Sequence, residues 1–201
     1  LTLRAAEGRE PTIAVSAGSS DRTFGLQIAS HFLTLEDIEV TGGGAMGAIS
    51  VLASDGVHLL NVDLSGATNG VYAQFSKSPV VSGSTISATE SGIALRDLSV
   101  NALVDGNTVR DAETGVFLSG RTDERLFAVD ATVTGNTFEG VGDDIDTEGT
   151  ATIRDGSGET KQVGGEPPEN SMLDIVLYAA TATTIGALFY PYARRRLGGI
   201  R

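Results

Sequence analysis

The residues best suited to catalysis or metal binding in this chain are carboxylates. Asp143, Asp144 and Asp146 lie close together in the sequence, and neighbouring carboxylates can activate a water molecule or bind Ca²⁺ through their oxygen atoms. Glu39 and Asp63 occupy equivalent positions in two successive sequence repeats. Stacking of those repeats would place the two carboxylates roughly 5 to 6 Å apart, near the separation found in retaining glycosidases.

We interpret neither carboxylate group as catalytic. Gly142, Asp143 and Asp144 are interpreted as an acidic turn that leads into a terminal coil. Ca²⁺ binding by Asp143, Asp144 and Asp146 is the weaker alternative, because no recognisable metal-binding loop surrounds them. Stacking aligns any acids that share a column of a repeat. Glu39 and Asp63 are therefore interpreted as solvated surface or a loose cation site.

Soft metal ligands are scarce. The chain has no cysteine, two methionines and two histidines, so a disulfide framework and a thiolate metal site are both excluded. His31 and His58 fall at different positions of the repeat. We assign no cofactor and no resident metal.

The elements that must position these residues come from a short repeated motif. Each repeat has a leading residue, an aliphatic residue, any residue and then, in most repeats, an apolar residue. The leading residues are Gly25, Ala48, Gly70, Gly92, Gly115 and Asp144. The intervals between them are 23, 22, 22, 23 and 29 residues. A period near 22 residues, without sustained helical periodicity before residue 170, predicts a solenoid of short strands.

Three apolar columns run through the repeats. The first column is Leu26, Ile49, Val71, Ile93, Val116 and Ile145, the second is Leu35, Leu59, Val81, Val104 and Val133, and the third is Val40, Leu64, Ile86, Val109 and Phe138. Strands that meet their equivalents one repeat later pair in parallel, each coil rising roughly 4.8 Å. We predict an all-β fold, a parallel β-helix of about six coils.

Two sets of polar residues follow from the same register. Ser84, Asn107 and Asn136 stand where a turn residue points inward, and stacked amides there can hydrogen-bond between coils. We interpret them as a structural turn ladder.

On the outward side of the first column, we predict a candidate ligand face of Tyr72, Gln74, Arg96 and Phe117. The two rings could stack on sugar rings while Gln74 and Arg96 donate hydrogen bonds. Contact with a packed loop or another protein is the alternative. The repeat expands once, around Gly120 to Arg125, which is either a binding rim or a tolerated surface loop.

Several segments resemble a known group of proteins. Val104-Asp-Gly-Asn-Thr-Val109, Val133-Thr-Gly-Asn-Thr-Phe138 and Val81-Ser-Gly-Ser-Thr-Ile86 look like right-handed parallel β-helix repeats of the pectin-lyase-like superfamily, most similar to its NosD-like and carbohydrate-binding and sugar-hydrolysis branch. The resemblance covers about residues 1 to 155 and implies a right-handed coil. It does not select a function, because the superfamily includes lyases, hydrolases, epimerases, adhesins and non-enzymatic surface proteins.

Two activities implied by this resemblance are not supported by the residues present. Gly142-Asp143-Asp144 resembles the Gly-Asp-Asp element of polygalacturonase-like hydrolases, but the companion Asn-Thr-Asp, Gly-His-Gly and Arg-Ile-Lys elements are missing from this sequence. Copper delivery, implied by the NosD-like similarity, would need soft ligands that are nearly absent. We assign no catalytic residue and no copper site.

The charge of the chain excludes some partners. There are 26 acidic and 14 basic residues, giving a formal net charge of −12. Such a surface repels nucleic acid and anionic lipid. The acidic, lysine-poor composition also resembles that of proteins from extreme halophiles, which implies a haloarchaeal source. An ordinary acidic secreted protein is the alternative.

The last part of the chain changes character. Residues 156–170 are rich in glycine, glutamate and proline, which predicts a flexible linker after the β-helix of residues 1–155. Residues 171–193 are mostly apolar and predict a single transmembrane helix. Arg194, Arg195 and Arg196 begin a basic tail, 194–201, that marks the cytoplasmic side and leaves the β-helix outside the cell.

The chain opens with a strand-like Leu1-Thr-Leu3 and no initiator methionine, from which we expect further coils upstream. Together these features predict a membrane-tethered β-helix that acts as a binding or structural module at the cell surface, in contact with polysaccharide or another surface protein. The alternatives are the non-catalytic C-terminal part of a carbohydrate-active lyase or hydrolase, and a NosD-like scaffold subunit of a transport or surface assembly.

Overall fold

A computed structural model of the chain describes residues 1–5, 11–15, 24–120, 129–155, 157 and 159–163. Within these residues the chain forms strands and turns, and they belong to a compact unit that spans Leu1–Gly165. The strands are β1 (Thr2–Arg4), β2 (Thr12–Ala14), β3 (Leu26–Ile28), β4 (Thr34–Glu36), β5 (Glu39–Thr41), β6 (Gly47–Leu52), β7 (His58–Leu60), β8 (Asp63–Gln74), β9 (Val80–Ser82), β10 (Thr85–Arg96), β11 (Ala102–Asp105), β12 (Thr108–Arg110), β13 (Thr114–Ser119), β14 (Val129–Thr134), β15 (Thr137–Glu139), β16 (Asp143–Glu148), β17 (Ala151–Arg154) and β18 (Thr160–Val163).

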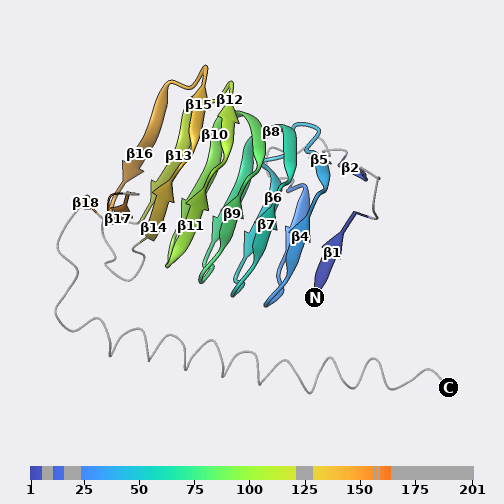
Figure 1. Cartoon of the computed structure of the whole chain (residues 1–201), viewed down its shortest axis with the longest axis horizontal. Helices are drawn as coiled ribbons and strands as arrows, with labels where there is room; N and C mark the ends of the chain where they lie inside the picture. The colour runs from blue at the N-terminus through green and yellow to red at the C-terminus, as the bar shows by residue number, and fades with distance from the viewer. Residues whose placement is uncertain (6–10, 16–23, 121–128, 156, 158, 164–201) are drawn as a thin grey trace. The chain divides into compact units, whose positions relative to one another are not determined.

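The strands form two sheets that wind into a solenoid (Figure 1). One sheet has eight strands in the order β1-β4-β7-β9-β11-β14-β17-β18. The other has ten strands and contains the rest. Strands pair in parallel with their equivalents in the next coil, as β4, β7 and β9 do. The predicted all-β parallel solenoid of about six turns is therefore confirmed.

The register of the strands matches the three apolar columns. In the first column Ile49 pairs with Val71, and Ile93 pairs with both Val71 and Val116. The second and third columns show the same one-to-one pairing between successive coils. Each column thus stacks equivalent side chains directly above one another, as the sequence predicts.

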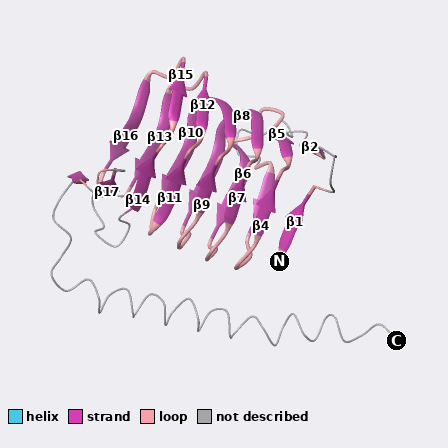
Figure 2. Cartoon of the chain, viewed as in Figure 1, coloured by secondary structure: helices cyan, strands magenta, loops and turns pink. Residues whose placement is uncertain are grey.

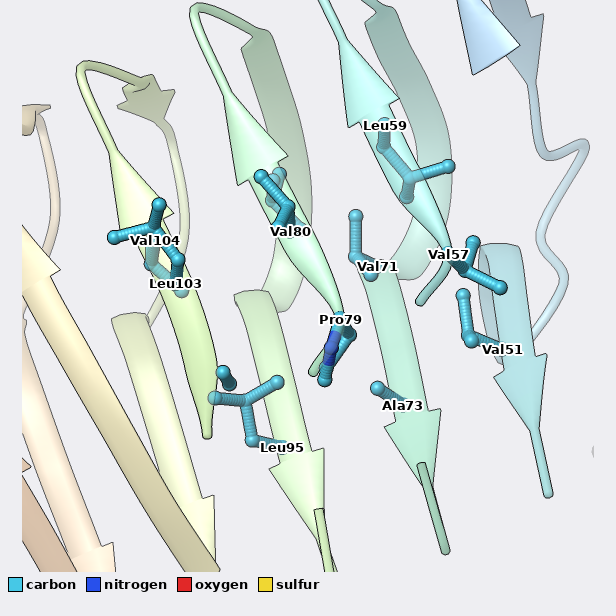
Figure 3. A pocket seen from close by; sticks show the side chains of 12 residues that line it. Val51, Val57, Leu59, Val71, Ala73, Pro79, Val80, Leu95, Leu103 and Val104 are labelled. Carbon is cyan, nitrogen blue, oxygen red and sulfur yellow. The ribbon is translucent and has the colours of Figure 1, made fainter. Parts of the chain in front are cut away.

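The interior of the coils is apolar and closely packed. Figure 3 shows Val51, Val71 and Leu95 on one side of this interior and Leu59 and Val104 on the other. These five residues are at most 1% exposed, and the space among them does not admit a water molecule. No single coil encloses this core, so burial of each apolar side chain depends on the coils above and below it.

The leading glycines are required where successive coils approach closely. A Cβ placed on Gly92 would lie 2.8 Å from the Gly115 carbonyl oxygen and closer still to Cγ1 of Val109. Both distances are shorter than a carbon atom tolerates. Asp144 holds the leading position on β16, whose only parallel partner in the described chain is β13, and its side chain is exposed.

The end of the solenoid differs from the predicted linker. Thr160–Val163 forms β18, which pairs antiparallel with β17, although these residues lie within the range 156–170. The turn between the two strands is built on Asp155, whose Oδ1 accepts hydrogen bonds from the backbone N–H groups of Ser157 and Glu159. Part of the range predicted as a linker therefore forms a further strand of the solenoid sheet.

Candidate binding face

The candidate ligand face lies on the outward side of β8, β10 and β13. The register places Ala94 of β10 beside Tyr72 of β8 and Phe117 of β13. Arg96 stands two residues after Ala94 and therefore points to the same side of the sheet. Because Ala94 is small, the space between the two aromatic side chains is open to the longer side chain of Arg96.

Arg96 lies across both rings. Its guanidinium carbon is 5.1 Å from the ring centre of Phe117 and 5.9 Å from that of Tyr72. Both distances are within the range of cation–π contacts, each contributing about 0.5–1 kcal/mol at a partly exposed site. The structure therefore brings Arg96 into contact with both aromatic rings that the sequence assigns to this face.

Tyr72 is largely covered. Its ring centre is 5.5 Å from that of Phe24, and only 9% of the residue is exposed. Burial raises the pKa of the Tyr72 hydroxyl, Arg96 opposes that rise, and Asp97 adds to it. The sequence led us to expect that the Tyr72 ring could stack on a sugar. In the structure the ring is not open to a sugar, because Phe24 and Arg96 pack against it. Phe117 remains half-buried.

The side chain of Gln74 is hydrogen-bonded to a residue of the neighbouring turn. Its Nε2 donates a hydrogen bond of 2.7 Å to Oδ2 of Asp97, and Asp97 is buried. This bond fixes the side chain of Gln74 beside Arg96, its partner in the register. Gln74 therefore offers its oxygen more readily than its N–H₂ group to a ligand.

Arg96 differs from other arginines of the solenoid in its partners. Arg4, Arg110 and Arg154 each pair with a carboxylate of a neighbouring coil. In the described part of the chain no carboxylate pairs with Arg96, and its Nε is buried without a hydrogen-bond partner. Its register partners are uncharged, namely Gln74 and Ser119. The hydroxyl of Ser50, which is next to Tyr72 in the register, is likewise buried without a partner.

The residues assigned to the turn ladder bond between successive coils. The Oδ1 of Asn107 accepts from the backbone N–H of Ser84 at 3.0 Å, and the Oδ1 of Asn136 accepts from the backbone N–H of Asn107 at 2.9 Å. The Nδ2 of Asn107 donates to the carbonyl of Val81. These bonds satisfy backbone groups that the turn would otherwise leave buried and unpaired.

A second ladder was missed by sequence reasoning. Ser54, Ser76 and Ser99 are buried, and each hydroxyl donates to a carbonyl of the preceding coil, those of Ile28, Val51 and Ala73 respectively. The signal in the sequence is a serine at the same turn of each coil. It is weaker than the aliphatic columns because serine is also common in exposed turns.

The carboxylates singled out from the sequence remain at the surface. Glu39 and Asp63 are direct neighbours in the register, and Oε2 of Glu39 accepts a hydrogen bond of 2.6 Å from the hydroxyl of Thr12. Asp143, Asp144 and Asp146 are all exposed on β16. Among the residues that the structure describes, no group of three histidine, cysteine or acidic side chains has a metal-binding arrangement.

A cavity of about 410 Å³ lies at the last described coil, and only one of the three aspartates lines it. Its lining includes Asp146 but neither Asp143 nor Asp144. The lining residues are Ile145, Asp146, Thr147, Ile153, Asp155 and Glu159. His31 lies in the turn before β4 and His58 is the first residue of β7. Both are exposed, and they do not share a site.

Some predicted features lie outside the described residues. These are most of the expansion at Gly120 to Arg125, the apolar segment 171–193, and the basic tail with Arg194, Arg195 and Arg196. In the part of the chain that the structure does describe, no helix has the length and apolar character needed to cross a bilayer.

Comparison with known proteins identifies the fold family. No curated protein and no solved structure gave a significant match to the chain. Residues 10–157 match the family described as right handed beta helix region. This match covers more than half of the 201 residues and agrees with the parallel pairing and register described above. The chain belongs to the right-handed β-helix family.

Proposed function

We propose that this β-helix is a binding module that holds polysaccharide at a cell surface, and that the face around Arg96 and Phe117 contacts the sugar. The observation that carries the proposal is the position of Arg96. Its guanidinium lies on two aromatic rings and has no carboxylate partner in the described chain. A cation held in this way presents fixed hydrogen-bond donors beside an aromatic ring, which is the combination that sugar-binding sites use.

The charge of the chain narrows the class of sugar. A net charge of −12 repels a polyanion over roughly 10 Å at 0.1 M salt. A neutral polysaccharide meets no such repulsion, and its hydroxyl groups can accept from Arg96 and donate to the Gln74 oxygen. We therefore assign neutral polysaccharide as the preferred ligand and expect acidic polysaccharide to bind only when salt screens the charges.

Affinity electrophoresis of the full chain tests this assignment. Native gels containing laminarin, xylan or galactomannan should retard the chain, and retardation should not depend on added salt. Gels containing polygalacturonate should retard it only at high salt. Arg96→Gln and Phe117→Ala should each abolish most of the retardation.

Two further variants make the test specific. Arg110→Gln removes an exposed arginine that pairs with Glu139 at 2.7 Å on a different strand, and it should leave retardation unchanged. Ala94→Leu keeps Arg96 and both rings but fills the space between them, so it should reduce retardation. Equal retardation of all variants would refute the proposed face, and free migration of the wild-type chain in every gel would refute saccharide binding.

A membrane tether, a NosD-like relationship and a halophilic source belong to the same proposal. They are supported by the apolar run 171–193, the arginines that follow it, the repeat segments quoted above and the small number of lysines. Expression of the full chain with its C-terminal segment should give a protein that alkaline carbonate does not extract from membranes. Complete extraction by carbonate would refute the tether and leave the sugar-binding face to be judged by the gels.

A further inference from the structure

Phe32 has an unusual conformation for an exposed aromatic residue. It lies in the turn between β3 and β4, is 69% exposed and has a φ of 54°. Bulky side chains rarely adopt positive φ. Gly56 and Ser78 hold the equivalent position in the next two coils, because all three backbone N–H groups donate to the following coil in the same way. A phenylalanine at this position therefore needs an explanation beyond the geometry of the turn.

Gly56 provides a seat for the Phe32 ring. A Cβ on Gly56 would lie 2.8 Å from Cδ1 and 3.1 Å from Cε1 of Phe32. Only a glycine leaves room for the ring to rest there, on the backbone of the next coil. The Cδ1–Cε1 side of the ring is thus supported while most of the residue faces solvent.

Phe75 belongs to the same series of turns. It follows β8 directly, is 41% exposed and has a φ of 53°. Figure 2 shows these turns along the lower edge of the solenoid, where the chain passes from one sheet to the other. The other exposed large hydrophobic residues in the described chain are Leu1, which precedes β1, Leu3 on β1 and Ile145 on β16. The flank of the solenoid therefore has its two exposed rings on one edge.

We infer that this turn edge is a second saccharide subsite, in which the ring of Phe32, supported on Gly56, stacks on a sugar ring of the same polysaccharide chain. This inference rests on the proposed function, because it extends the same ligand from the Arg96 face onto the adjacent turns. The continuity is direct: Gln74 ends β8 on the face, and Phe75 is the next residue on the edge.

The surroundings of Phe32 favour a sugar over a protein or a nucleic acid. Asp55 precedes Gly56 in the turn of the next coil, and the exposed Lys77 is the register partner of Asp55 one coil further on, so the edge lacks the continuous apolar patch of a protein interface. The net charge of −12 opposes nucleic acid. A single exposed ring among charged, hydrogen-bonding groups suits a ligand whose small apolar ring faces alternate with hydroxyl groups.

The absence of tryptophan from the chain allows a local test. Phe32→Trp introduces a single tryptophan on the edge, and Phe117→Trp introduces one on the Arg96 face. With the full chain and laminarin, xylan or galactomannan as the probe, the tryptophan emission of Phe32→Trp should shift to shorter wavelength as the sugar covers the ring. The shift should saturate at the same sugar concentration that retards this variant in the gel.

Substitutions then measure the contribution of the edge. Phe32→Ala should weaken retardation by about three- to tenfold, the usual contribution of one stacked ring. Phe32→Leu should weaken it similarly because it keeps apolar character but lacks a flat ring. Gly56→Ala should also weaken it by displacing the ring. Gly66→Ala is the matched control, since its φ of +69° imposes similar backbone strain and its Cβ would make only ordinary contacts, the nearest being the Thr41 methyl at 3.5 Å and the Gly43 nitrogen at 3.6 Å.

The outcomes separate the two subsites. If the Phe32→Trp variant is retarded but its emission does not change, the edge is not a subsite and the Arg96 face still stands. If Phe32→Ala weakens binding while Arg96→Gln does not, the edge stands and the proposed face fails. Nucleic acid or protein competing with the sugar for the Phe32→Trp signal at equal concentration would overturn the saccharide assignment, as would retardation that is unchanged in Phe32→Ala and Gly56→Ala.

Discussion

Replacing Gly92 by alanine is expected to destabilise the solenoid more than its small change in size implies. The new methyl group would lie 2.8 Å from the Gly115 carbonyl oxygen and 3.1 Å from Cγ2 of Val109, and closer still to Cγ1. Non-bonded carbon atoms prefer about 3.5–4.0 Å. Relief requires movement of the buried Val109 side chain or of the backbone of the next coil, where β10 and β13 pair.

The magnitude follows from those two movements. Overpacking a well-packed core costs about 1–3 kcal/mol, and weakening one or two hydrogen bonds between coils adds about 1 kcal/mol each. We therefore expect Gly92→Ala to lower the free energy of unfolding by about 2–5 kcal/mol. Gly106→Ala is the control, because Gly106 has a φ of +64° and open space around its Cβ position. Gly106→Ala should lower the free energy of unfolding by about 1–2 kcal/mol, which is the cost of holding an alanine at positive φ.

Urea unfolding followed by far-ultraviolet circular dichroism measures both variants. Adding Val109→Ala to Gly92→Ala supplies an internal check, since the new methyl group then enters space that the valine vacates. The double variant should be at least about 1 kcal/mol more stable than the sum of the single effects implies. A Gly92→Ala variant no less stable than Gly106→Ala, or strict additivity with Val109→Ala, would refute the explanation of the leading glycines.

The other predictions concern the turn ladder and Tyr72. Asn107→Ala should lower the free energy of unfolding by about 2–5 kcal/mol in the same urea assay, because it leaves the Ser84 N–H and the Val81 carbonyl without their partners, at about 1–3 kcal/mol each. Thr108→Ala, its outward neighbour, should change stability by less than about 1 kcal/mol, and equal effects would contradict the ladder. In an absorbance titration compared with Tyr72→Phe, Tyr72 should ionise above its ordinary pKa of about 10, because burial raises that pKa. The stabilising effect of the neutral hydroxyl is then present below pH 10 and is lost as the pH rises through the folded-state pKa. Arg96→Gln should raise the pKa of Tyr72 further, since Arg96 lowers it, and a fall in that variant would contradict the contact.

The repeat carried most of the information about the fold. Aliphatic residues recur at inward positions because each column must fill the same space in every coil, so the register could be read from residues such as Ile49, Val71 and Ile93. The end of the solenoid was harder to predict. Composition alone does not distinguish a flexible linker from the tight turn at Asp155 that leads into β18, because both use glycine and serine.

The candidate site was only partly predictable. Outward alternation put Tyr72, Arg96 and Phe117 on one face, and the structure brings them into contact. The cover that Phe24 places over Tyr72 could not be foreseen, because Phe24 precedes the first strand column and follows no repeat. The seat that Gly56 gives to Phe32 was hidden for a related reason. A glycine in a turn is expected for its backbone conformation, and the side chain resting on it comes from another coil.

The most direct test of the proposed function is an NMR titration of the arginine Nε–H groups. The Nε of Arg96 is buried without a partner, whereas the Nε of Arg110 donates to Glu139 at 2.7 Å, so the two should give distinct signals that Arg96→Gln and Arg110→Gln assign. Titration with oligosaccharides cut from laminarin, xylan and galactomannan should move the Arg96 signal with at least one of them and leave the Arg110 signal in place. An Arg96 signal that stays fixed while the chain binds sugar, or that moves no more than the Arg110 signal, would contradict the assignment of this face.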